Sequence, residues 1–230
     1  MARSIQPSVP PHGKGQREAI LAEAAALFAL RGYHGTSMSD LAEACGLSKA
    51  TLYHHYRDKS EVLTHIADGH VSRLVELCDS VERDPAVTPD DRLRVLVERF
   101  LAEYAEAQNS HRVLTEDVRF LPSPDRNRIL DKERHVVQSF ADAVAALRPD
   151  LAKKKLTKPL AMLLFGMLNW MFTWLRPNGA LTHASVTPLV LNLFFDGVRN
   201  MPAPMPHPRL VRVPRAAPVA AKRASRARTA

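Results

Sequence analysis

Residues 38–53 read MSDLAEACGLSKATLY and follow Ser37. Ser37 with Asp40 three residues later is a capping box, a pattern that starts many helices. This helix would end at Gly46, because glycine readily adopts the positive φ angle that a tight turn requires. Ser48 would then cap a second short helix. Two short helices joined in this way predict a helix-turn-helix motif.

The apolar residues of this stretch fall on one side of both helices. Leu41, Leu47 and Leu52 would pack against a preceding helix at about residues 15–31, and Ala42 is small enough for close helix contact. The other side chains of the second helix would then face outward, where they suit a DNA groove. They are Lys49, Ala50, Thr51, Tyr53, His54 and His55.

Apolar residues recur at helical spacing through most of the chain, and strand-like alternation is absent. The pattern predicts an all-α fold of about nine helices, placed at residues 15–31, 36–46, 49–56, 58–84, 89–109, 111–121, 124–147, 157–175 and 186–200. We expect four regions: a disordered arm (1–13), a helix-turn-helix DNA-binding domain (14–60), a second helical domain (61–200) and a disordered basic tail (201–230).

The bulk composition of the 230-residue chain is that of a globular protein, with 46% hydrophobic residues and a formal net charge of +8. The positive charge is concentrated at the end of the chain, since residues 201–230 carry seven Lys or Arg and no acidic residue. Residues 17–64 carry five basic and six acidic residues, so net charge does not identify the DNA-binding domain. The two cysteines are far apart, and neither a signal peptide nor a membrane span is indicated, which predicts a cytoplasmic protein.

The region from Arg17 to Leu63 resembles the DNA-binding domain of the TetR family of bacterial regulators. Four motifs carry the resemblance: Phe28-x-x-Arg31-Gly32-Tyr33, Thr36-Ser-Met-x-x-Leu41-Ala42, the run Gly46-Leu-Ser-Lys-Ala-Thr-Leu-Tyr-His-His-Tyr56, and Asp58-Lys59-x-Glu61-x-Leu63. They cover about 47 of the 230 residues. Beyond them the family is diverse, and the resemblance implies only a helical body.

The resemblance assigns roles to individual residues. Thr51, Tyr53, His55 and Lys59 are similar to residues that bind phosphates, and Lys49, Ala50 and His54 take base-reading positions. Thr36 or Ser37 would offer backbone N–H groups and a hydroxyl to a phosphate, and Ser48 completes the predicted DNA-binding set. The alternative is a plain scaffold in which the tyrosines pack and the histidines face solvent.

The last two predicted helices are candidates for dimerisation. Residues 157–175 and 186–200 are apolar over most of their surface, and one surplus apolar face would meet its symmetry mate in a four-helix bundle. A homodimer would place two recognition helices in successive major grooves of a double-stranded DNA operator. The alternative is that both helices are internal core.

The resemblance also implies a small-molecule effector held by the fourth to seventh helices, which makes residues 61–200 the predicted effector-binding and dimerisation domain. The candidate pocket residues are Phe100, Tyr104, His111, Arg112, Arg119, His135, Met162, Phe165, Asn169, Trp170 and Phe172. Residues 166–179 are similar to segments of family members that sense acyl-CoA thioesters, which makes an acyl-CoA the predicted effector. Alternatives are a cationic or hydrophobic drug, with control of an efflux gene, and a metal effector at His111, Glu116 and His135.

Other classes of protein find less support. The sequence has no Gly-rich phosphate loop, nucleophile elbow or HExxH motif, so we predict neither an enzyme nor a cofactor or metal site. A non-specific architectural DNA-binding protein is a further alternative, because the basic stretch 209–228 could bind DNA without sequence preference.

Overall fold

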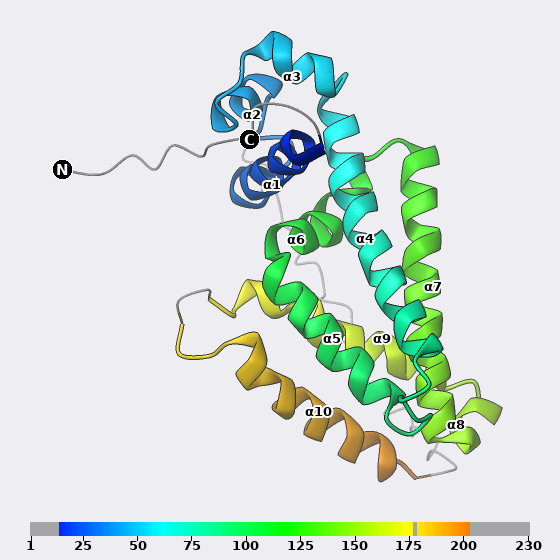
Figure 1. Cartoon of the computed structure of the whole chain (residues 1–230). Coiled ribbons are helices and arrows are strands. Elements are labelled where there is room, and N and C mark those ends of the chain that lie inside the picture. The colour runs from blue at the N-terminus through cyan, green and yellow to red at the C-terminus, as the bar shows by residue number, and fades with distance from the viewer. Residues whose placement is uncertain (1–13, 177–178, 203–230) are drawn as a thin grey trace, which may run out of the picture.

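The computed structural model describes residues 14–176 and 179–202, which fold into ten α-helices and two 3₁₀ helices and contain no strand (Figure 1). The all-α prediction is confirmed. The predicted arm, and all but two residues of the predicted tail, lie outside the described residues. The elements are α1 (Lys14–Arg31), α2 (Met38–Ala44), α3 (Lys49–His55), α4 (Lys59–Arg83), α5 (Arg92–Glu106), α6 (Gln108–Asp117), η1 (Val118–Phe120), α7 (Ser123–Leu147), α8 (Pro149–Lys153), α9 (Thr157–Leu168), η2 (Met171–Thr173) and α10 (His183–Arg199).

Helices α1, α2 and α3, together called the head, form one end of the molecule (Figure 1). Ile20 and Phe28 of α1 are buried with Leu41 of α2 and Leu52 of α3, as the apolar spacing predicts. Gly46 has a φ of +64°, where a side chain with a Cβ atom would be strained. The turn between the two short helices therefore depends on glycine.

Helix α4 connects the head to helices α5–α10, and α4–α10 together are called the body. Its first residues follow the N-cap Asp58, whose side chain accepts a hydrogen bond from the backbone N–H of Glu61 at 2.8 Å. Farther along, α4 packs against α5, α6 and α7 (Figure 1). A domain boundary at residue 60 thus falls in the first turn of one continuous helix. A shift of α4 in the body would move the head.

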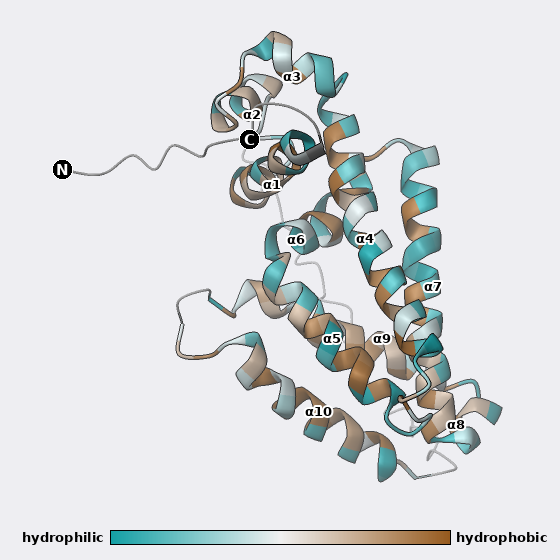
Figure 2. Ribbon diagram, viewed as in Figure 1, coloured by the Kyte–Doolittle hydropathy of each residue, from teal (hydrophilic) through white to brown (hydrophobic). Residues whose placement is uncertain are grey.

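The core of the body is formed by apolar side chains of α4, α5, α7 and α9, including the clustered rings of Phe100, Phe140 and Phe165. Figure 2 shows hydrophobic residues along these helices and along α10. Helix α10 packs against α5, and α9 packs against α7. Within the described ranges, no helix combines the length and the apolar character needed to cross a membrane.

The clearest departures from the sequence prediction are two helix boundaries and one helix that was not expected. The expected helix at 157–175 ends at Leu168 and is followed by η2, because the apolar run continues past the helix end and conceals it. Helix α10 begins at His183 rather than residue 186, since Thr182 and Ser185 form a capping box that we did not use. The five-residue α8 was not predicted, because it is too short to show a helical period.

Candidate nucleic-acid interface and internal cavity

One side of helix α3 is packed into the head, and the opposite side is exposed to solvent. Leu52 is fully buried in the head, and Ser48 accepts a hydrogen bond from the backbone N–H of Thr51 at 3.1 Å. Lys49 at the start of the helix is exposed, and Tyr53 is 53% exposed. The capped first turn and one flank of α3 are therefore accessible to a partner.

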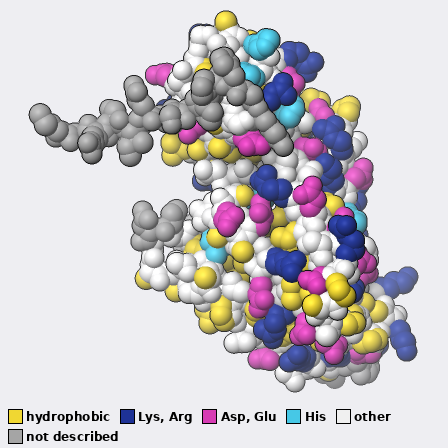
Figure 3. All heavy atoms as spheres, in the orientation of Figure 1, with side chains coloured by type: hydrophobic (Ala, Val, Ile, Leu, Met, Phe, Trp, Pro, Cys, Tyr) yellow, Lys and Arg dark blue, Asp and Glu magenta, His cyan; other side chains and the backbone are white. Residues whose placement is uncertain are grey.

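Much of the predicted DNA-binding set forms an exposed surface on the head. Figure 3 shows histidine and Lys or Arg side chains gathered at this end of the molecule. The exposed members are Ser37, Ser48, Lys49, Ala50, Tyr53 and His54, and Thr51 is partly buried. Hydroxyl, imidazole and ammonium groups bind phosphates and base edges, so this surface has the chemistry of a DNA reader.

The polar groups at the start of α2 differ from those of the exposed surface, because they form hydrogen bonds within the chain. Thr36 is 1% exposed, and its hydroxyl donates to the carbonyl of Gly32 at 3.0 Å. The backbone N–H and hydroxyl of Ser37 both donate to Asp40, at 2.7 and 2.6 Å. These hydrogen bonds lower the pKa of the Asp40 carboxyl. In this structure neither predicted residue has its polar groups directed to a phosphate.

Two further predicted phosphate ligands also make contacts inside the head. The Lys59 ammonium donates to the carbonyls of Tyr33 and Thr36, at 2.6 and 2.7 Å, and lies over the Tyr33 ring. His55 is partly buried, with Nε2 3.1 Å from the side-chain oxygen of Gln16. Burial, with smaller contributions from Arg17 and His54, lowers the pKa of His55. Here His55 joins α3 to α1, and Lys59 joins the start of α4 to the loop between α1 and α2.

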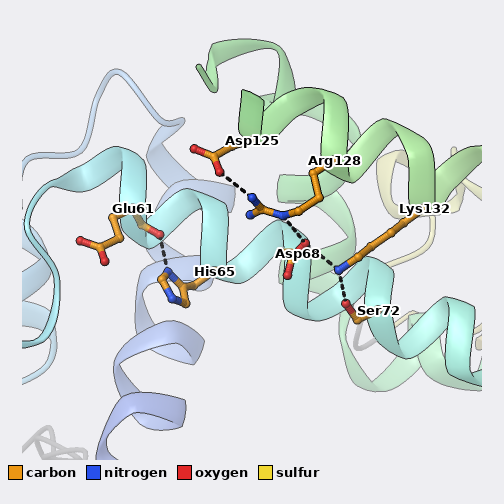
Figure 4. A network of polar contacts seen from close by, with 7 residues as sticks. All are labelled: Glu61, His65, Asp68, Ser72, Asp125, Arg128 and Lys132. Atoms are coloured by element: carbon orange, nitrogen blue, oxygen red, sulfur yellow. Dashed lines mark hydrogen bonds and ion pairs between the residues drawn. The ribbon is translucent and has the colours of Figure 1, made fainter. Parts of the chain in front are cut away.

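A polar network fixes α4 to α7 below the head (Figure 4). Asp68 on α4 accepts hydrogen bonds from Lys132 at 2.7 Å and Arg128 at 3.4 Å, both on α7. Lys132 also donates to Ser72 at 2.8 Å, and Arg128 donates to Asp125 at 2.9 Å. The network opposes sliding of α4 along α7.

The head also touches the body through aromatic rings. Phe120 in η1 stacks on Tyr33, with ring centroids 5.7 Å apart, and meets the edge of His34 at 4.3 Å. Because η1 directly follows α6, the loop between α1 and α2 rests on the end of α6. A change in the packing of α6 would therefore reach the head by a second route besides α4.

A cavity of about 170 Å³, partly open to solvent, lies among α4, α5, α6, α7 and α9. Five of the predicted pocket residues line it: Tyr104, His111, Met162, Phe165 and Asn169. Tyr104 donates a hydrogen bond from its hydroxyl to Oδ1 of Asn169 at 3.0 Å, and its ring stacks on His111 with centroids 3.6 Å apart. Val71 and Leu74 supply the wall from α4. The cavity thus adjoins the helix that connects to the head.

The remaining predicted pocket residues lie elsewhere. Among the aromatic residues, Phe100 is in the core beside Phe140, Phe172 lies near Arg112, and Trp170 is exposed. Among the polar residues, Arg112 pairs with Glu116, Arg119 lies over the Phe120 ring, and His135 contacts Asp79 at 3.1 Å. The side chains considered for a metal, His111, Glu116 and His135, therefore have separate partners. Among the described residues, no group of three or more His, Cys, Asp or Glu side chains is placed to hold a metal ion.

Sequence reasoning missed two polar residues at the centre of the body. Glu133 lines the cavity from α7, and burial raises the pKa of its carboxyl. His70 on α4 is fully buried, with Nε2 3.4 Å from Nδ1 of His111. A usable signal existed for Glu133, because it occupies the inward stripe of Ile129, Val136 and Phe140 at spacings of four, three and four residues.

An exposed, capped recognition helix joined by one long helix to a body with an internal cavity defines a helix-turn-helix DNA-binding regulator. Two family models match the chain: "Bacterial regulatory proteins, tetR family" over residues 20–66, and "Tetracyclin repressor-like, C-terminal domain" over residues 86–198. The chain belongs to the TetR family of transcriptional regulators. Members of this family bind DNA operators as dimers and bind small-molecule effectors.

Individual relatives extend the similarity over most of the chain. A TetR-family transcriptional regulator from Bordetella parapertussis has 34% sequence identity and a TM-score of 0.76, with 83% of this chain and 100% of that chain covered. The transcriptional repressor KstR2 of Mycobacterium tuberculosis is 26% identical, with 80% of this chain and 92% of KstR2 covered. The structure of AibR in complex with isovaleryl coenzyme A and operator DNA has 25% identity and a TM-score of 0.67, with 77% and 96% coverage.

Proposed function

We propose that this protein represses transcription by binding a palindromic operator as a homodimer, and that an acyl-CoA thioester releases it. The carrying observation is that α4 starts beside the predicted DNA-reading surface and lines the internal cavity with Val71 and Leu74. A ligand that displaces these two side chains would shift the helix that bears the head. Effector binding and DNA binding then favour different positions of α4.

The dimer is proposed to form through α9 and α10. Leu189 and Leu193 are 61% and 70% exposed and follow each other at i, i+4 on α10, and Leu163 on α9 is 66% exposed. Large apolar side chains with this exposure are typical of a protein interface. Pairing of these helices with their symmetry mates would bury them in a four-helix bundle.

The effector class is proposed from two observations. AibR, similar over 96% of its length, was crystallised with isovaleryl coenzyme A and operator DNA. The cavity of this chain is largely apolar and offers Tyr104 and Asn169 as polar groups, a composition common in sites for small organic ligands. KstR2 is named as a repressor, which supports repression rather than activation.

The test is a binding-site selection followed by release. Full-length protein should select one palindrome from a randomised duplex pool, and isovaleryl-CoA should release that duplex while free isovalerate and a cationic dye should not. Selection of no preferred sequence would contradict a specific regulator. Release by the cationic dye alone would replace the acyl-CoA effector with a drug-like one.

A further inference from the structure

One polar atom of the cavity has no role in holding the fold. His111 is 4% exposed, and its Nε2 atom is buried without a hydrogen-bond partner among the described residues. The carbonyl of Asn169 lies near the ring but does not meet Nε2 with hydrogen-bond geometry. Buried polar atoms are almost always paired, because an unpaired one loses its hydrogen bonds to water. The atom is therefore a candidate for binding a ligand.

The ring of His111 is held by a chain of contacts that leads to solvent. Its Nδ1 is 3.4 Å from Nε2 of His70, whose Nδ1 is 3.6 Å from Glu103. Arg73 donates to the same Glu103 oxygen at 2.9 Å, and its Nη2 lies 3.5 Å from Nδ1 of His70. The hydrogen bond from His70 is the main reason why the pKa of Glu103 is lowered, so this carboxylate is charged.

Two tautomers of the histidine pair are compatible with these contacts. If His70 donates from Nδ1 to Glu103, His111 donates from Nδ1 and keeps a lone pair on Nε2. If His70 accepts from Arg73 at Nδ1, His111 accepts at Nδ1 and carries a proton on Nε2. Burial, followed by the neighbouring His70, lowers the pKa of His111 to about 3, so the ring is neutral at physiological pH. A hydroxyl, which both donates and accepts, can pair with Nε2 in either tautomer.

The size and charge of the cavity restrict the ligand further. Its volume of about 170 Å³ is close to the roughly 150 Å³ cavity that holds one benzene molecule in an engineered protein. No Lys or Arg occurs among the described residues that line it, and the one carboxyl, Glu133, is itself disfavoured as an anion by burial. An anionic group would find no counter-ion there.

We propose that the cavity holds a small, uncharged, mainly apolar group that carries a hydroxyl, and that this hydroxyl forms a hydrogen bond with Nε2 of His111. Asn169 completes the site: its Oδ1 is taken by Tyr104, and its Nδ2, without a hydrogen bond among the described residues, can donate to the hydroxyl oxygen. The inference rests on the proposed effector function and names the chemistry of the effector end that is buried. An acyl-CoA with a short hydroxylated acyl group meets these conditions.

The first experiment compares two thioesters that differ by one hydroxyl. Titration calorimetry of the full-length protein should show 3-hydroxyisovaleryl-CoA binding about tenfold more tightly than isovaleryl-CoA, since a hydrogen bond to an otherwise unpaired group favours the ligand by about this factor. In the variant His111→Phe, which keeps an aromatic ring against Tyr104, the two thioesters should bind with about equal affinity. The control His135→Phe removes an exposed histidine and should keep it. Equal affinity of the wild type for both thioesters overturns the proposal.

A second set of probes separates this proposal from the acyl-CoA effector. Phenol should bind more tightly than benzene in a ligand-observed NMR titration, whereas a wholly apolar cavity would prefer benzene. Preference for phenol without binding of either thioester keeps the hydroxyl site and removes the acyl-CoA effector. Binding of both thioesters with equal affinity would keep the acyl-CoA effector and remove the hydroxyl site. Tighter binding of benzylamine than of phenol, lost in Glu133→Gln, would identify a cation site and overturn the hydroxyl assignment.

Discussion

The outward face of the head and the cavity of the body position their polar residues in different ways. On the head, the capping contacts of Ser37 and Ser48 join residues only three positions apart, and the exposed side chains of α3 face outward. Around the cavity, polar partners lie far apart in sequence: His70 and His111 are separated by 41 residues, and Tyr104 and Asn169 by 65. The α3 surface is therefore set by local sequence and is accessible to a partner, whereas the polar groups of the cavity meet only through the packing of distant helices.

The largest expected effect is on operator affinity, through the proposed dimerisation of the body. Leu193→Arg places a charge on the exposed apolar stripe of α10 and should prevent dimerisation. Operator affinity should then fall by about 100-fold or more, because two linked heads bind far more tightly than one. Sedimentation velocity and fluorescence anisotropy on the same sample measure both changes. Gln138→Arg, an exposed position on α7, is the matched control and should leave both unchanged. A Leu193→Arg protein that remains dimeric would place the interface elsewhere.

The next effect divides the outward face of α3 into two kinds of contact. Lys49→Ala should change which base is preferred at one operator position, at a cost of about 1–3 kcal/mol for the original site. Tyr53→Ala should weaken binding to every sequence by a similar factor, since a phosphate contact carries no base information. Binding-site selection with each variant measures the difference. An unchanged preference in Lys49→Ala would remove its base-reading assignment.

A smaller effect tests whether Lys59 binds a DNA phosphate or keeps its internal contacts in the head. Its ammonium donates to the carbonyls of Tyr33 and Thr36, so Lys59→Met should lower the free energy of unfolding by about 1–2 kcal/mol. The salt dependence of operator binding should stay the same if this contact persists on DNA. A salt slope reduced by about one unit would instead show that Lys59 binds a phosphate. Arg57→Met, a neighbouring exposed position, serves as the control for loss of charge.

The smallest effect concerns the network between α4 and α7. Burial alone would raise the pKa of Asp68, but the hydrogen bond and charge of Lys132, together with Arg128, lower it overall. The stabilisation is therefore complete above the unfolded value of about 3.9 and is lost as the pH falls through the lower folded pKa. Asp68→Asn should cost about 1 kcal/mol at pH 7, and in urea unfolding experiments the difference from wild type should shrink as the pH falls below about 4.

A matched control for this network is Asp131→Asn, since Asp131 pairs with Arg134 within α7 alone and is more exposed. It should change stability by less than Asp68→Asn does. If the two substitutions cost the same at pH 7, the contact between α4 and α7 adds nothing beyond an ordinary surface ion pair. If the Asp68→Asn difference persists at low pH, its cause is not the charge of Asp68.

Local pattern was sufficient for the head. Capping residues, the glycine at the turn and the apolar spacing are all set within a few residues, so α2, α3 and the outward position of Lys49 and Tyr53 could be predicted. The same reasoning did not show that Thr36, His55 and Lys59 make internal contacts, because their partners Gly32, Gln16 and Tyr33 are identified only when the helices are packed together.

The sequence by itself determined that this chain is helical, that it carries a helix-turn-helix near its N-terminus and that it resembles TetR regulators, because helix caps and apolar periods are local. Only the tertiary structure decided which polar residues share a site. It brought Glu133 to the cavity, left His135 outside and set His70 against His111. The physical reason is that a side chain's direction follows from its own helix, whereas its partner depends on how helices distant in sequence pack around a common core.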